Sequence, residues 1–158
     1  APAMRTRRGF TLIEILVVLM LIGVGLTYAA LSFGGYFQRV AAQRAAEVFA
    51  RDLTTARGFA TRSRVPVVIR FYESALRYEV ERQGSTTDIA VRRFGVNADI
   101  DLTGITLEFT GDSVVFNSRG FADLSGAAGA LGTATFSSGA ARYTVSFNSM
   151  GASKIDRT

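Results

Sequence analysis

One carboxylate, Glu14, lies inside an apolar run that extends from Phe10 to Phe33. The run is about 24 residues long, and about 20 apolar residues cross a bilayer as a helix. A charge at the centre of such a helix costs roughly 2.5–3.5 kcal/mol on insertion scales, so a carboxylate there usually has a function. A carboxylate in hydrocarbon either takes up a proton or pairs with a cation. Arg39 is the first basic residue after Glu14, so a cationic partner must come from the N-terminal side or from another chain.

The charges before the apolar run predict its orientation. Arg5, Arg7 and Arg8 precede it, and basic flanks remain on the cytoplasmic side of a membrane. The residues after the run are then expected outside the cytoplasm. A cleaved secretory signal peptide is the alternative, but its apolar core is typically about 7–15 residues long and is followed by a small-residue cleavage site. Here the run is longer and Gly9 stands before it, which favours a retained membrane helix.

Composition excludes several kinds of site. The chain has 158 residues with no cysteine and no histidine, so disulfides, thiol chemistry, zinc sites built on these ligands and histidine acid–base catalysis are excluded. The formal net charge is +5, but it is unevenly distributed. Three arginines lie in residues 1–9, seven arginines against two acids lie in residues 39–70, and eight basic against ten acidic residues follow in residues 71–158. The chain is therefore expected to have a basic helix and a slightly acidic body.

Apolar periodicity predicts that the helix continues beyond the membrane. Residues 40–60 repeat apolar side chains at spacings near three and four, with arginines on the other faces. The pattern ends near residues 62–64, because the residue before Pro66 disfavours the helical region. We therefore expect one helix from Phe10 to about Ser63, which spans the membrane in its first half and is amphipathic in its second.

After Pro66 the apolar period changes to two, which predicts strands. The predicted strands cover residues 67–72, 76–82, 89–94, 105–109, 114–116, 133–136 and 142–147. Gly111 and Asp112 are interpreted as a hairpin turn between the fourth and fifth strands, and Met150 as the start of a turn into a short tail. The order of elements predicts an α+β fold, with a long N-terminal helix packed on an antiparallel β-sheet or β-sandwich-like C-terminal domain.

The N-terminal residues resemble the class III signal of type IV prepilins. The match consists of a basic leader, a Gly–Phe junction, a glutamate five residues after the glycine and the apolar run, and it reads Arg7-Arg8-Gly9-Phe10-Thr11-Leu12-Ile13-Glu14. A second resemblance, to the minor pseudopilins and minor pilins of the GspH/FimT family, is carried by residues 51–67, by residues 115–120 and by a glycine-containing basic tail. It implies a β-sandwich-like pair of sheets on the second half of the long helix.

The first resemblance implies how the N-terminus is processed. A prepilin peptidase is expected to cut between Gly9 and Phe10 and to methylate the new amine of Phe10. Cleavage creates a cation about one helical turn from Glu14. We therefore expect Glu14 to pair with its own or a neighbour's amine and to set the register of subunits, because a wrong stagger leaves a buried charge unpaired. The alternative is that Glu14 lies near the membrane surface and has no function.

The resemblance also implies partners and location. The expected partners are prepilin peptidase, other pilin or pseudopilin subunits and inner-membrane lipid, with no cofactor, no metal and no catalysis. The chain is expected as a single-pass inner-membrane protein with a cytoplasmic N-terminus and a periplasmic β domain, and then as a fibre subunit, near the tip. The expected division is a leader at 1–9, a transmembrane and assembly helix at 10–33, an amphipathic helix at 34–64 and a β domain at 65–158.

Two other functions remain open from the sequence. Some FimT-like minor pilins bind DNA during uptake through a basic tail that begins at a glycine, and residues 151–157 offer Lys154 and Arg157. An acid separates these two cations, and each lost phosphate contact weakens electrostatic affinity, so DNA binding is the disfavoured alternative. The other is a single-pass anchor that never assembles. Asp99 and Asp101 are interpreted as solvated loop acids rather than a cation site.

Overall fold

The computed structural model describes residues 10–85, 87–109, 111–124 and 131–158, without the side chains of residues 30–32. The chain divides into two compact units, Ala1–Gly34 (unit 1) and Gly35–Thr158 (unit 2). One α-helix, α1 (Leu12–Ser63), continues from the first unit into the second. The strands that follow are β1 (Val67–Tyr72), β2 (Arg77–Arg82), β3 (Asp88–Arg93), β4 (Gly104–Leu107), β5 (Ser113–Phe116), β6 (Ala122–Asp123), β7 (Leu131–Ser138), β8 (Ala141–Asn148) and β9 (Ser153–Arg157), with a 3-10 turn at Glu73–Ala75 after β1.

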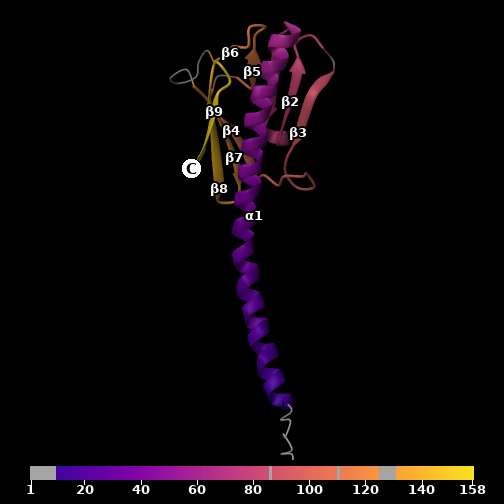
Figure 1. Ribbon diagram of the computed structural model, residues 1–158, viewed down its shortest axis with the longest axis vertical. Coiled ribbons are helices and arrows are strands. Elements are labelled where there is room, and N and C mark those ends of the chain that lie inside the picture. The colour runs from indigo at the N-terminus through magenta and orange to yellow at the C-terminus, as the bar shows by residue number, and fades with distance from the viewer. Residues whose placement is uncertain (1–9, 86, 110, 125–130) are drawn as a thin grey trace, which may run out of the picture. The chain divides into compact units, whose positions relative to one another are not determined.

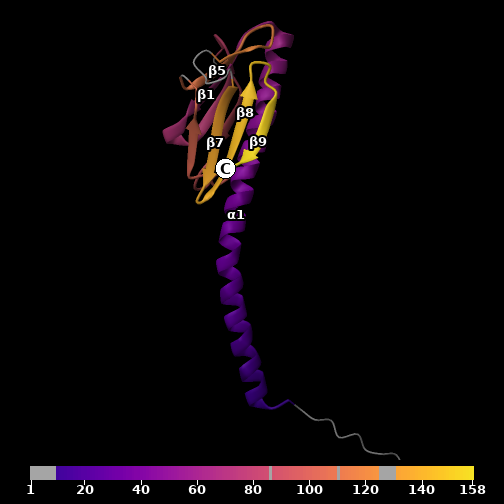
Figure 2. The ribbon, with the colours of Figure 1, turned by 90° about the vertical axis from the view of Figure 1, so that its left-hand side faces the viewer.

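The strands form two antiparallel sheets. Sheet A has the order β3-β2-β1-β5-β6, and sheet B has the order β4-β7-β8-β9. Within unit 2, both sheets lie beside the second half of α1 (Figures 1 and 2), and in the view of Figure 1 β2 and β3 lie on one side of the helix and β4, β7, β8 and β9 on the other. The predicted α+β fold, with a long helix packed on antiparallel β-sheets, is confirmed.

Phe49 lies at the centre of the core, where α1 meets both sheets. Its ring lies 5.4 Å from that of Phe71 and 5.6 Å from that of Tyr78 in sheet A, measured between centroids. It lies 5.5 Å from the ring of Phe136 and 5.8 Å from that of Phe147 in sheet B. Tilted and edge-to-face pairs at these distances each add about 0.5–1.5 kcal/mol beyond the burial of area. Phe49 therefore holds the two sheets to one helix.

Small side chains let α1 approach the sheets closely. The helix residues that are fully buried in unit 2 are mostly alanines, at positions 42, 45, 46, 56 and 60, together with Phe49 and Leu53. Their spacing follows one face of the helix. The strands supply the larger apolar side chains, so that one alanine stripe fills the space between two inner sheet faces.

The predicted hairpin at Gly111 and Asp112 is wrong. The strand before it, β4, pairs with β7 in sheet B, whereas the strand after it, β5, pairs with β1 in sheet A. The pairing continues past both strand ends, because the Glu108 N–H donates to the Thr133 carbonyl and the Phe71 N–H donates to the Asp112 carbonyl. The glycine-containing segment is therefore a crossover between the sheets.

The expected short tail is a strand in the structure. Residues 153–157 form β9, which pairs with β8 so that Ile155 lies opposite Val145. A two-residue strand, β6, was not predicted; it pairs with the end of β5. Strand β9 agrees with the interpretation of the tail as a solvated terminal strand, whereas β6 was missed because so short a segment carries little of the apolar alternation from which strands are predicted.

Candidate functional site

The helix begins at Leu12 because Thr11 caps it. The Glu14 N–H donates to the Thr11 side-chain oxygen at 3.3 Å and to the Thr11 carbonyl at 3.1 Å. Threonine followed three residues later by glutamate is the spacing of a capping box. The sequence carries this signal for the start of the helix, although the predicted start, at Phe10, rests on the apolar run alone. Thr11 is therefore a residue that positions Glu14.

Glu14 is exposed in the first turn of α1. The aligned peptide dipoles give a helix N-terminus a partial positive charge, which favours a negative side chain in the first turn by about 0.3–1 kcal/mol at an exposed site. Glu14 thus has a favourable partner within its own helix, in addition to the amine that cleavage is expected to create. Gly9 lies outside the described residues. Phe10 precedes the helix, and its side chain is 79% exposed.

The first half of α1 has no protein partner in the described residues. Every described side chain from residue 10 to residue 39 is exposed. Among the described residues, α1 is the single helix long and apolar enough to cross a membrane, with a mean hydropathy of 2.4 in its most apolar window. An apolar surface of this extent is stabilised only by lipid or by other apolar helices. The structure therefore leaves this half of α1 available for intermolecular contact.

The two tail cations lie on the edge strand β9 of sheet B. The Lys154 Nζ lies 2.8 Å from the Asp156 carboxylate, so part of its charge is already compensated. Arg157 lies opposite Tyr143 in the register of β8 and β9. In an antiparallel strand, residues 154 and 157 point to opposite faces of the sheet. The structure does not bring Lys154 and Arg157 together into one basic patch.

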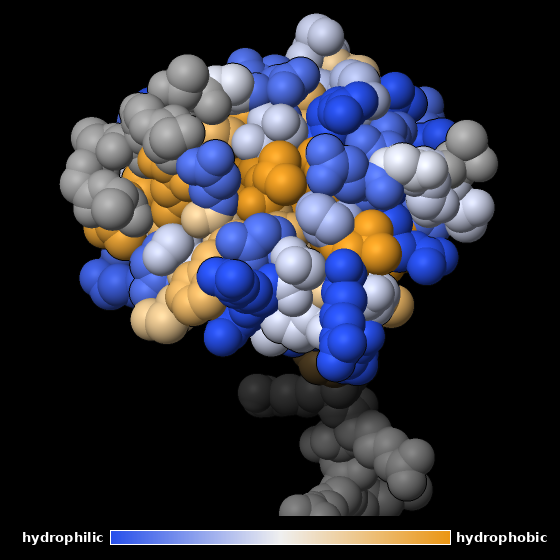
Figure 3. Space-filling model, turned by 90° about the horizontal axis from the view of Figure 1, so that it is seen from above, coloured by the Kyte–Doolittle hydropathy of each residue, from blue (hydrophilic) through white to orange (hydrophobic). Residues whose placement is uncertain are grey.

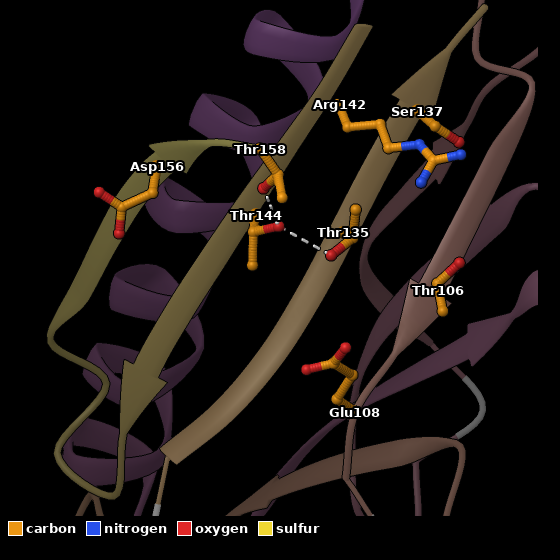
Figure 4. Close-up of a pocket in the computed structure, with 8 residues that line it drawn as sticks. All are labelled: Thr106, Glu108, Thr135, Ser137, Arg142, Thr144, Asp156 and Thr158. Atoms are coloured by element: carbon orange, nitrogen blue, oxygen red, sulfur yellow. Dashed lines mark hydrogen bonds between the residues drawn. The ribbon is translucent and has the colours of Figure 1, made fainter. Parts of the chain in front are cut away.

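The outer face of sheet B carries a shallow groove of about 520 Å³ lined by hydroxyl groups and a few charges. Figure 4 shows these side chains on the face of the sheet turned away from α1. The Thr144 hydroxyl is hydrogen-bonded to those of Thr135, at 2.9 Å, and Thr158, at 2.8 Å. These three hydroxyl groups are hydrogen-bonded to one another, and the bonds join β7, β8 and the end of the chain on the exposed face of the sheet.

A buried polar cluster fixes α1 against sheet A. Asp52 of α1 is 6% exposed. It accepts a hydrogen bond from the Tyr78 hydroxyl at 2.8 Å and two from the Arg92 guanidinium, at 2.8 and 3.1 Å. Burial, and then the neighbouring Asp52 charge, raise the pKa of Tyr78, and the hydrogen bond to Asp52 raises the pKa of Arg92. The cluster fixes the position of α1 relative to β2 and β3. No periodic pattern in the sequence indicates it.

Asp99 and Asp101 lie in the segment between β3 and β4. Asp99 borders a pocket of about 370 Å³ whose other charged residues are Arg44, Glu47 and Arg51 of α1. Within the described ranges, there is no group of three or more side chains of the types that hold a metal ion. The interpretation of Asp99 as a loop acid stays a prediction.

Two family models match the chain. The prokaryotic N-terminal methylation motif matches residues 4–30, over the capped start of α1 and the exposed apolar half. The model for the type II transport protein GspH matches residues 45–151, over the second half of α1 and both sheets. The chain belongs to the GspH family. This assignment confirms the resemblance to type IV pilin-like proteins that the leader and the β region suggested.

Solved structures of minor pilins resemble this GspH-family chain. The type IV minor pilin FimU of Pseudomonas aeruginosa strain PAO1 is 16% identical with a TM-score of 0.54, over 78% of this chain and 92% of FimU. A second crystal form of FimU gives a TM-score of 0.50 at the same identity, over 73% and 91% of the two chains. The minor pseudopilin EpsH of the Vibrio cholerae type 2 secretion system is 13% identical with a TM-score of 0.48, over 73% and 96%. No curated protein matches the chain. At these identities, the likeness to FimU supports the fold alone.

Proposed function

We propose that this chain is a minor pilin or minor pseudopilin that assembles into a fibre through residues 10–33. A prepilin peptidase cuts it between Gly9 and Phe10 and methylates the amine of Phe10. One joint observation supports the proposal: the matched methylation motif covers an exposed apolar half-helix with a single carboxylate in its capped first turn. Membership of the GspH family, whose model matches residues 45–151, supports the same class.

Glu14 sets the register of the subunit in this proposal. Cleavage brings a positive amine within about one helical turn of its carboxylate. In a bundle of parallel helices, the amine of a neighbour can take the same position. A wrong stagger would leave a charge in hydrocarbon without a partner, which costs about 3–5 kcal/mol. The carboxylate therefore selects one stagger among many that the apolar surface alone would permit.

The proposed location follows from the same features. The helix half anchors the chain in the inner membrane before assembly, with unit 2 on the periplasmic side. The subunit then joins a type II secretion pseudopilus or a type IV pilus, near its tip. The DNA-uptake alternative has less support, because Lys154 is already paired with Asp156.

The test replaces Glu14 in the full-length chain, in cells that assemble the fibre. Glu14→Val should leave leader processing intact, measured by the mass of the mature chain, and should lower the amount in sheared fibres at least tenfold. Glu14→Gln, which keeps the shape but not the charge, should behave in the same way. Glu47→Gln is the matched control, since Glu47 lies in the second half of α1 and accepts a hydrogen bond from Gln43. Unchanged incorporation of both Glu14 variants would contradict the assigned role.

A second variant tests processing. Gly9→Leu places a bulky side chain at the bond that the peptidase must reach, so the precursor should accumulate in the membrane at its full mass. Processing at the wild-type rate would show that the cut lies elsewhere. A wild-type chain that the peptidase never cuts would favour the non-assembling anchor.

A further inference from the structure

Two turns at the end of unit 2, where α1 ends, share one sequence pattern and one hydrogen-bond pattern. Residues 116–121 read Phe-Asn-Ser-Arg-Gly-Phe, and residues 147–152 read Phe-Asn-Ser-Met-Gly-Ala. In both, the first phenylalanine is fully buried and the glycine has a positive φ, of 81° and 71°. In both, the asparagine side-chain oxygen accepts hydrogen bonds from the backbone N–H groups two and four residues later, at 2.9–3.1 Å. The same network therefore fixes both turns.

The two turns are joined to each other and to α1. The Ala122 N–H donates to the Ser149 carbonyl at 2.6 Å, which links β6 of sheet A to the turn between β8 and β9 of sheet B. Arg57 of α1 lies against both glycines. A Cβ on Gly120 would lie 3.2 Å from the Arg57 Cγ, and a Cβ on Gly151 would lie 3.7 Å from the Arg57 Cδ. The turns and the end of α1 thus form one fixed surface, which we call the turn platform: residues 57–65, 117–122 and 148–152.

The turn platform exposes apolar side chains between arginines. Phe121 and Met150 are 46% and 47% exposed, and they directly adjoin the bonded pair that joins the turns. Arg62, Arg64 and Arg119 are exposed, and none of them takes part in an ion pair among the described residues. Figure 3, which views this end of unit 2, shows hydrophobic residues in the middle and hydrophilic residues around them.

We propose that the turn platform is a docking surface for the globular domain of another pilin-like subunit that presents carboxylates around an apolar contact. The inference rests on the proposed function, since it names a surface that assembly would use. An apolar centre rich in aromatic residues and methionine, with arginines and a polar rim, is the usual anatomy of a protein–protein interface. The partner is expected to be acidic, because the turn platform contains four arginines and no carboxylate, and Asp123 is the one acid that directly adjoins it in the sequence. Such complementarity selects the partner and its orientation.

The rigidity of the turn platform strengthens this inference. Surfaces fixed before binding lose less conformational entropy on association than mobile loops do. In each turn, four backbone N–H groups donate to acceptors within the same turn, and the side chains of Arg119, Phe121 and Met150 are exposed for contact with a partner. A nucleic acid is the competing occupant, because arginine and phenylalanine also bind phosphates and bases. It would need a continuous basic track along its backbone, whereas here the arginines flank an apolar centre.

The test uses site-specific photo-crosslinking of the full-length chain in cells that assemble the fibre. A photoreactive benzoylphenylalanine replaces Phe121 or Met150, and the matched control replaces Val91, which is 37% exposed on β3. Positions 121 and 150 should give adducts with a subunit that carries its own N-terminal methylation motif, identified by mass spectrometry. Position 91 should give at most a tenth as much of that adduct.

Charge reversal then tests the chemistry. Arg119→Glu combined with Arg64→Glu should lower the adduct at least tenfold, with unchanged processing and abundance of the chain. Arg93→Glu, on β3, is the matched control and should have no effect. Replacing a carboxylate in the crosslinked peptide of the partner by lysine should restore the adduct of the doubly reversed variant.

Three results would overturn the inference. Equal adducts at positions 91 and 121, while incorporation still depends on Glu14, would reject the turn platform and leave the proposed function standing. Adducts with nucleic acid instead of a subunit would show that the turn platform binds nucleic acid, and would reject the proposed subunit. Absence of the wild-type chain from any fibre would reject both the proposed function and the docking surface.

Discussion

Residues 12–33 and residues 35–63 form one continuous helix, but their side chains have different surroundings. In the first half, large apolar residues such as Leu12, Leu16 and Leu26 are 83%, 60% and 65% exposed. In the second half, seven apolar residues are completely buried. The backbone hydrogen bonding is the same in both halves. The difference lies in what covers the helix: the two sheets of unit 2 cover the second half, whereas the described side chains of the first half are exposed.

The two halves also differ in the size of their apolar side chains. The second half buries five alanines, one phenylalanine and one leucine, because the inner faces of the two sheets supply most of the larger apolar side chains. The first half uses leucine, isoleucine and valine all around the helix, which suits contact with lipid or with other apolar helices. One half therefore determines the stability of unit 2, and the other is available for assembly. Substitutions should separate these two properties.

The largest effect on stability is expected for Phe49→Ala. The substitution removes a ring that contacts four aromatic rings in both sheets. Loss of a fully buried phenylalanine costs about 3–5 kcal/mol through lost transfer energy and the cavity left behind. Denaturant unfolding of the full-length chain in detergent micelles, followed by near-UV circular dichroism, should show a much lower midpoint.

Leu16→Ala is the matched control in the first half of α1. The side chain is 60% exposed and lies in unit 1. The unfolding midpoint of unit 2 should stay within about 0.5 kcal/mol of the wild type, as for other substitutions away from the core. A shift comparable with that of Phe49→Ala would contradict the division between the two halves.

The same comparison explains how much the sequence could predict. The apolar run, the helical periodicity of residues 40–60 and Pro66 together predicted a helix that ends at about Ser63, where α1 ends. Alternation of apolar and polar residues predicted most strands, because this pattern depends only on which side of each strand is buried. The assignment of strands to sheets was not local. Ile105 and Val114 are both apolar residues of predicted strands, and nothing in residues 105–116 indicates which strand each will pair with. In the structure, the strand of Ile105 pairs with β7 and the strand of Val114 pairs with β1.

The candidate sites were predicted unevenly for a similar reason. Glu14 stands out because its neighbours are uniformly apolar, so one charge is conspicuous. Asp52 lies among arginines and polar residues, so its burial against Tyr78 and Arg92 could not be distinguished from exposure on a solvated helix face. The repeated turns were readable in the sequence as two copies of Phe-Asn-Ser-X-Gly, but their proximity depends on the two sheets that α1 brings together.

The next largest effect on stability is expected for Gly120→Ala, and Gly34→Ala is its matched comparison. Gly120 has a φ of +81°, and a Cβ there would lie 2.7 Å from the Thr61 Cγ2. Gly120→Ala should therefore lower the free energy of unfolding by about 1–3 kcal/mol, the range for a strained backbone conformation. Gly34 lies in α1, and a Cβ added there would have no neighbour within 4 Å among the described residues. Gly34→Ala should stabilise the helix by up to about 1 kcal/mol. If both substitutions changed the free energy of unfolding in the same direction, Gly120 would not be required for the close contact between its turn and Thr61.

The smallest effect is expected from the pH dependence of the Asp52 cluster. Tyr78 has an ordinary pKa of 10.0, and burial together with the Asp52 charge raises its pKa in the folded chain. A raised pKa means that the folded state holds the proton more tightly than the unfolded state does. The stability from neutral Tyr78 is therefore complete below pH 10.0 and falls as the pH rises above it. The decline approaches about 1.4 kcal/mol per pH unit for one proton.

Tyr78→Phe should remove this decline while lowering stability at neutral pH. Loss of a hydrogen bond to a charged group costs about 1.5–3 kcal/mol, and we expect the lower end because Arg92 still pairs with Asp52. The side chain of Arg92 is 43% exposed, so water screens that pair, and most of the pH effect should come from Tyr78. Unfolding of both chains between about pH 8 and about pH 11 should show the two stabilities converging. Tyr36→Phe, at a position 61% exposed, should keep the wild-type pH profile. If Tyr36→Phe also removed the decline, the effect would belong to tyrosine ionisation in general rather than to the contact between α1 and sheet A.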